Sequence, residues 1–160
     1  MEINFLALLA AAVSALIIGA IWYNPKVFGT AWMKAADMTE EKMQGANMAK
    51  IFILAFIFAF LLAFALQFLT IHQTGALGMV GGDPSLAKPS FEAFMADYGT
   101  AFRTFKHGAL HGTIAGIFIA LPILGTNALF ERKGAKYIFI NAGYWIVTMA
   151  IMGGIVCGWQ

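Results

Sequence analysis

Residues 109–130 read ALHGTIAGIFIALPILGTNALF and contain no Asp, Glu, Lys or Arg. A helix of about 20 apolar residues is long enough to cross the hydrocarbon core of a bilayer. Three further stretches have the same character, so the chain carries four in all: residues 3–23, 51–71, 109–130 and 137–159. The sequence therefore predicts an all-α integral membrane protein, with a single membrane domain over residues 1–160, four transmembrane helices and short interfacial amphipathic helices.

The composition of the whole chain agrees with this class. Apolar residues make up 61% of the 160 residues and charged residues 11%, whereas soluble domains carry about 45–50% and about 25%. The net charge is only +2 and no basic run is present, so we expect no nucleic-acid partner. The lipid bilayer is the expected environment, and the single cysteine, Cys157, excludes an intramolecular disulfide.

The positive side chains are distributed unequally between the two sides, and an excess of Lys and Arg marks the cytoplasmic side. The loops after the first and third stretches contain seven: Lys26, Lys34, Lys42, Lys50, Arg132, Lys133 and Lys136. The other side has three: Lys88, Arg103 and Lys106. We expect both termini to be extracytoplasmic. The first stretch is expected to be a retained helix, because Glu2 is the only charged side chain before it and a signal peptide needs positive charge there.

Three segments outside the four stretches have their own character. Apolar side chains recur at helical spacing in residues 27–35, which predicts a short helix on the inner membrane face. An apolar stripe along residues 90–106 predicts an amphipathic helix on the outer surface. Four glycines in residues 73–89 indicate a mobile connection ahead of that helix.

Small residues recur at helical spacing within three of the four stretches. In lipid, helices associate by close packing, which small side chains permit. We expect packing surfaces at these positions: Gly108, Gly112, Gly116, Ala55, Ala59, Ala63, Gly154 and Gly158.

All three histidines of the chain are expected on the outer side. His107 and His111 are four residues apart on one helix face, and His72 ends the second stretch. Three imidazoles can bind zinc or copper, and two on different helices can hold a haem iron. The spacing alone favours an interface or packing role, so we expect no bound cofactor. His72, His107 and His111 are the ligand set if a metal is bound.

A second polar layer is expected near the inner side. It contains Asn127, Asn141 and Tyr144. Side-chain amides in hydrocarbon usually form hydrogen bonds across helices, and the alternative is a polar entrance to a pore. Pro122 lies between the two layers, where a proline removes a backbone hydrogen bond and can kink the helix.

Three stretches resemble a widespread family of small membrane proteins, catalogued as domain of unknown function seventeen sixty-one. They are WYNPKVFGTAWM (residues 22–33), ALHGTIAGIFIALPILGTNALFER (109–132) and INAGYWIVTMAIMGGIVCGW (140–159). The resemblance covers nearly the whole chain and implies four transmembrane helices in a bacterial cytoplasmic (inner) membrane. It also suggests which residues belong to the family pattern: Trp22, Pro25, His111, Gly112, Pro122, Asn127, Asn141 and Trp159.

The leading functional hypothesis is a helix-packed homo-oligomer whose polar layers line a path for a small solute or ion. The alternatives are a metal- or haem-binding membrane subunit, and an accessory or scaffold subunit of a larger membrane complex. We expect no enzymatic activity, because the sequence lacks a Walker loop, a dinucleotide fingerprint, paired catalytic carboxylates and a hydrolase elbow.

Overall fold

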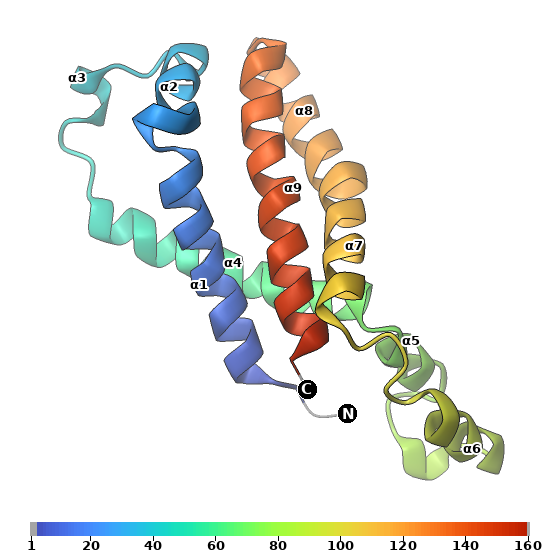
Figure 1. The fold of residues 1–160 in the computed structure, drawn as a ribbon. Coiled ribbons are helices and arrows are strands. Elements are labelled where there is room, and N and C mark those ends of the chain that lie inside the picture. The colour runs from blue at the N-terminus through green and yellow to red at the C-terminus, as the bar shows by residue number, and fades with distance from the viewer. Residues whose placement is uncertain (1–2, 160) are drawn as a thin grey trace.

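The structure, a computed structural model, describes residues 3–159, which are mostly helical and contain no strand (Figure 1). Four helices are long and apolar enough to cross a membrane. They are α1 (Phe5–Trp22), α4 (Met48–Thr70), the continuous helix of α7 (Phe105–Ala115), η3 (Gly116–Ala120) and α8 (Leu121–Phe130), and α9 (Ala135–Gly158). The prediction of an all-α, multi-pass membrane protein is confirmed.

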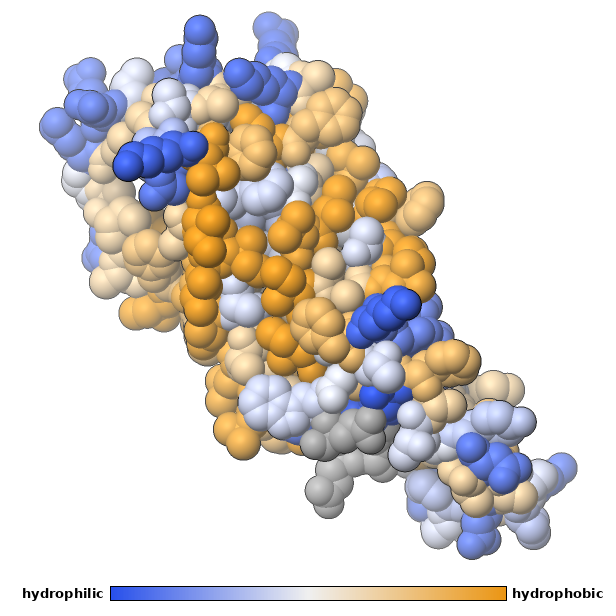
Figure 2. Space-filling view, viewed as in Figure 1, coloured by the Kyte–Doolittle hydropathy of each residue, from blue (hydrophilic) through white to orange (hydrophobic). Residues whose placement is uncertain are grey.

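The surface of the molecule matches this environment. Figure 2 shows a broad hydrophobic surface over the bundle and hydrophilic residues gathered toward its two ends. Many large apolar side chains on the spanning helices are exposed, for example Phe68 of α4 (60%) and Phe118 of η3 (72%). Such side chains would be unfavourable in water and are compatible with lipid.

Three spanning helices begin where a side-chain oxygen satisfies a free backbone N–H group. Asn4 Oδ1 accepts a hydrogen bond from the Ala7 N–H at 3.0 Å, and Asn47 Oδ1 accepts one from Lys50 at 3.0 Å. Thr104 Oγ1 does the same for α7. These capping residues fix where each helix starts.

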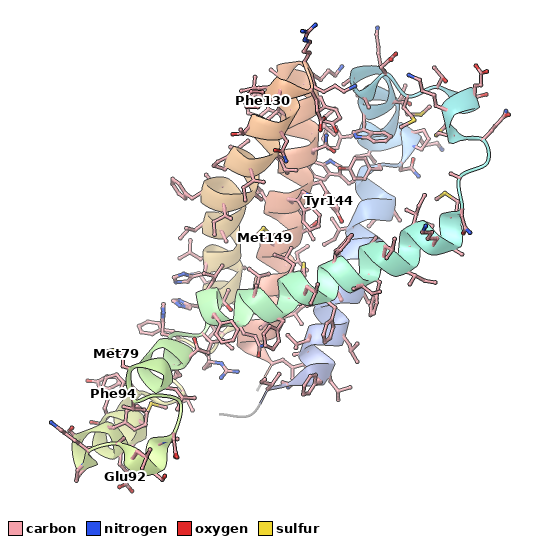
Figure 3. The ribbon with its side chains drawn as sticks, turned by 180° about the vertical axis from the view of Figure 1, so that it is seen from behind. Met79, Glu92, Phe94, Phe130, Tyr144 and Met149 are labelled. Atoms are coloured by element: carbon pink, nitrogen blue, oxygen red, sulfur yellow. The ribbon has the colours of Figure 1, made fainter. Side chains whose placement is uncertain are left out.

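The centre of the bundle consists mainly of small side chains. Ala59 and Ala63 of α4 are buried in one cluster with Ala11 and Ala15 of α1, while Ala55 is half-buried. Helix α4 lies obliquely across α1 and α9 (Figures 1 and 3). Its buried residues begin at Ala59, so its N-terminal half diverges from the bundle.

Helices α7 and α9 pack with their backbones in direct contact. A Cβ atom added to Gly108 would overlap the Gly153 carbonyl group. One added to Gly112 would overlap the Met149 carbonyl group, and one added to Gly116 would lie 2.7 Å from Ile146 Cα. Any larger residue at these three positions would therefore force the two helices apart.

Glycines on α9 continue this interface toward the start of α7. A Cβ atom at Gly154 would lie 2.6 Å from the Phe105 ring, and one at Gly158 would lie 2.6 Å from the Phe105 backbone nitrogen. The α7–η3–α8 helix continues through Pro122, which follows the five-residue π-helical segment η3. A π-helical segment changes the hydrogen-bond register of the backbone, so the helix can continue although proline has no N–H group to donate.

The segments on the histidine-bearing side differ from the sequence-based expectation. The glycine-rich residues 73–89 contain all of α5 (His72–Met79) except its first residue, and η2 (Pro84–Leu86). Helix α5 stops before Gly81 and Gly82, both at positive φ. The predicted helix over 90–106 is divided, because α6 (Pro89–Tyr98) ends before Phe102, whose φ is +62°. A left-handed residue interrupts a right-handed helix, and α7 begins anew after Thr104.

A short helix is present where residues 27–35 predicted one. The connection between α1 and α4 contains η1 (Pro25–Gly29), α2 (Thr30–Ala36) and α3 (Glu40–Met43). The Lys133 ammonium group donates a hydrogen bond to the Ala36 carbonyl oxygen at 2.9 Å, which joins α2 to the loop before α9.

Asn141 joins several elements at the end of the bundle that carries α2. Its Oδ1 accepts hydrogen bonds from the Tyr23 hydroxyl at 2.9 Å and from Trp32 Nε1 at 3.2 Å. One amide therefore holds α1, α2 and α9 together.

The α7–α9 contact leads to the first prediction. We expect Gly112→Ala to lower the free energy of unfolding by about 1–3 kcal/mol, because the new methyl group meets backbone atoms that cannot rotate away. Gly75→Ala on α5 is the matched control. It has open space around it and should raise stability by up to about 1 kcal/mol. Thermal unfolding in detergent measures both, and equal midpoints would contradict the prediction.

The hydrogen bonds to Asn141 lead to the second prediction. Asn141→Leu removes the acceptor for two donors at once and should cost about 1–3 kcal/mol of stability. Tyr23→Phe removes one donor, leaves the Trp32 hydrogen bond in place, and should cost less. The same thermal measurement tests this order, and a leucine variant as stable as the wild type would show that the amide does not join the helices.

Candidate metal centre

The three histidines come together at the end of the bundle where α4 ends and α7 begins (Figure 1). His72 is the first residue of α5, while His107 and His111 lie in the first two turns of α7. The ring centroids form a nearly equilateral triangle, with separations of 4.5 Å between His107 and His111, 4.8 Å between His72 and His107, and 4.9 Å between His72 and His111. Residues 35 positions apart therefore share one site.

The distances between the ring nitrogens suit a shared metal ion. One ligand nitrogen from each ring can be chosen so that all three lie within 4.8 Å of one another. Nε2 of His107 lies 2.9 Å from Nε2 of His72. A tetrahedral zinc ion with bonds of about 2.0–2.1 Å places its ligand nitrogens about 3.3 Å apart. The observed distances lie on both sides of this value, so small ring rotations would close the site on an ion.

The donor set has a clear chemical preference. Among residues 3–159 this is the one group of three or more His, Cys, Asp or Glu side chains arranged to share an ion. Neutral imidazoles suit zinc, copper, nickel and cobalt, whereas calcium and magnesium require oxygen ligands. Three protein ligands also leave a fourth tetrahedral position open.

Phe102 partly covers the cluster. Its ring stacks on His107 with centroids 5.0 Å apart, and it meets His72 edge-on at 6.0 Å. The side chain is 64% exposed, and its backbone adopts the left-handed conformation with φ of +62°. A left-handed phenylalanine is strained, and such outliers are concentrated at functional sites. Its ring restricts the rotation of two of the three imidazoles.

Two polar side chains hold the loop that carries Phe102. Gln73 is 6% exposed and its Nε2 donates to the carbonyl oxygens of Tyr98 and Ala101, each at 2.9 Å. Arg103 Nε donates to the Cys157 carbonyl oxygen at 2.9 Å. The loop is thereby joined to α5 on one side and to the end of α9 on the other.

The Cys157 thiol joins the segments that carry the histidines to the end of α9. It is fully buried, and Sγ donates to the carbonyl oxygens of Thr70 at 3.3 Å and of Phe102 at 3.5 Å. It thus connects α9 to the end of α4 and to the loop before α7. The thiol therefore stabilises the packing of these segments, and it is not among the three candidate ligands of a metal ion.

Sequence reasoning identified all three histidines but missed the residues that hold them. The sequence predicts a continuous amphipathic helix through Phe102, places Gln73 in the outer polar layer without a partner, and counts Arg103 only as a positive charge of the outer side. The signal was weak, because the positive φ at Phe102 follows from its tertiary surroundings. Thr104, a helix-capping residue type directly before His107, was the one local sign that a new helix begins there.

The second polar layer is only partly assembled. Asn127 and Asn141 line one cavity of about 170 Å³ with Glu131 and Tyr137. Tyr144 lies outside this cavity and donates a hydrogen bond to the Ala15 carbonyl oxygen at 3.0 Å. Between this layer and the histidines, the interior is filled by buried side chains of the core: Leu8, Ala11, Ala12, Ala15, Ala59, Ala63, Met149 and Met152.

Comparison with known proteins gives a family and no function. Neither a curated protein nor a solved structure matches the chain. The model of one protein family, described as protein of unknown function (DUF1761), matches residues 6–157, almost the full length. The chain therefore belongs to this family.

Proposed function

We propose that this protein binds one transition-metal ion through His72, His107 and His111 at the outer face of a bacterial cytoplasmic membrane. The observation that carries the proposal is the convergence of the chain's three histidines, with ring nitrogens at distances that suit shared coordination. This proposal adopts the alternative hypothesis of a metal-binding membrane subunit in place of the expectation that no cofactor is bound.

The distribution of charge supports the proposed orientation. The ends of α1 and α4 that carry the basic loops lie opposite the end where α5 begins, and the excess of Lys and Arg favours the cytoplasm for them. The histidines share their end of the bundle with the start of α1 and the end of α9 (Figure 1). In this orientation the site would receive an ion from outside the cell.

The geometry favours a bare ion over haem. A haem iron with two histidine ligands needs the porphyrin plane between the two imidazoles. Nε2 of His72 and Nε2 of His107 are 2.9 Å apart, which leaves no room for such a plane. A single ion with one open coordination position suits the triangle of rings better.

A path for a small solute or ion stays a prediction, and it would require more than one copy of the chain. The close-packed core separates the two polar layers within one chain, so such a path would run between copies. Assembly with a larger membrane complex through the exposed faces of the spanning helices likewise stays a prediction.

The metal proposal is tested on protein purified with a tag that lacks histidine, stripped with chelator and loaded with Co²⁺ or Zn²⁺. We expect one ion per chain, and visible Co²⁺ bands of the intensity typical of four-coordinate nitrogen sites. His107→Ala/His111→Ala removes two of three ligands and should abolish both signals.

Glu92→Gln is the matched control for this experiment. Glu92 is an exposed carboxylate on α6, and Figure 3 shows it at the far end of the outer segment. Its variant should bind like the wild type. Loss of the metal signals in both variants would show that the loss is not specific to the histidines, and an unchanged signal in the histidine variant would refute the site.

The contact between Phe102 and the histidines leads to a further prediction. Phe102→Ala should leave the stoichiometry at one ion and weaken the affinity by about tenfold, since groups that orient metal ligands usually contribute at least this much. Competition with a chromogenic chelator measures the change. Phe118→Ala, which removes an exposed ring of η3, is the control, and equal affinities in the two variants would show that Phe102 does not organise the site.

A further inference from the structure

A lateral groove separates α1 from the diverging half of α4. Its volume is about 600 Å³, and its lining comes from α1, α2, α4, α9 and the residue after α1. Small residues contribute to the lining, among them Ala15, Gly19 and Ala55. Aromatic rings, including those of Phe52 and Trp145, also line the groove. The groove lies within the spanning part of the molecule, and its lining is overwhelmingly apolar.

The size of the groove distinguishes between two kinds of apolar occupant. A helix with its side chains is about 10–12 Å across, so 600 Å³ holds only about one turn. A spanning helix of a second copy needs about 20 residues. A fatty-acyl chain is far thinner and can follow a narrow groove over much of its length.

One end of the groove lies at the side with the basic loops. Tyr23 and Trp32 line this end, and their polar atoms are already engaged with Asn141. Aromatic residues of this kind are typical of the headgroup level. Lys34 of α2 and Lys50 in the first turn of α4 are exposed at this end of the bundle. Positive charge there complements a lipid phosphate group.

We propose that this groove binds one acyl chain of an anionic phospholipid, whose phosphate group lies among the lysines next to α2 and the start of α4. The small residues let the chain lie against the backbones of α1 and α4, where it fills apolar space that water would occupy only at a large cost in free energy. The lipid would support α4 in its oblique position, on the side where α4 has no helix beside it. This proposal does not depend on the metal site.

The test is native mass spectrometry of protein taken from nanodiscs of phosphatidylethanolamine and phosphatidylglycerol. We expect the wild type to retain one phosphatidylglycerol. Ala20→Phe on α1 and Ala55→Phe on α4 each place a ring in the groove, from two different helices, and should each lose it. Ile123→Phe on α8 is the control, because Ile123 is 58% exposed and lies outside the groove. Helical circular dichroism and a single gel-filtration peak establish that each variant is folded.

A variant with two lysines neutralised tests whether the protein recognises an anionic headgroup. Lys34→Gln/Lys50→Gln should lose the preference for phosphatidylglycerol over phosphatidylethanolamine, while Lys136→Gln should keep it. Lipid retained by both groove-filling variants would overturn the proposal, as would a wild type that retains none. A wild-type dimer without lipid, which Ala55→Phe converts to a monomer, would assign the groove to a second copy instead.

Discussion

Direct backbone contact between α7 and α9 is the constraint on which the rest of the structure depends. Gly108, Gly112 and Gly116 bring α7 against α9 so closely that no side chain fits between them. Lipid tails are as apolar as leucine, so helices gain no stability merely by leaving lipid, and close packing becomes decisive. The glycines supply this contact without a polar group. They also fix the position of α7 along α9, and therefore where His107 and His111 lie.

The histidine cluster is a consequence of this packing at one end of the bundle. The buried Cys157 thiol holds the end of α4 against α9 through Thr70, and Arg103 holds the loop before α7 through the Cys157 carbonyl oxygen. Three helix ends thus meet at one point. Imidazoles placed there are close enough to share an ion and lie near the surface of the molecule.

The opposite end of the bundle is built differently. There a single amide, Asn141, accepts hydrogen bonds from two aromatic residues and joins three elements without leaving a site for an ion. Between the two ends, alanines allow α1 and α4 to cross closely. Because α4 crosses obliquely, only its second half can pack, and its first half leaves the lateral groove. One helix orientation therefore explains both the tight core and the open side.

The sequence by itself determined the class of the protein, because four uncharged apolar stretches have only one stable arrangement, as helices in a bilayer. It also determined the small-residue rows and the three histidines as candidates, since these depend on residue type and helical spacing. It did not show that the outer helix breaks at Phe102, nor that residues 73–89 contain α5, because both depend on hydrogen bonds to residues far along the chain. Only the tertiary structure decided that His72 meets His107 and His111. That meeting is set by the crossing of α4 with α9, a property of packed surfaces that no local pattern encodes.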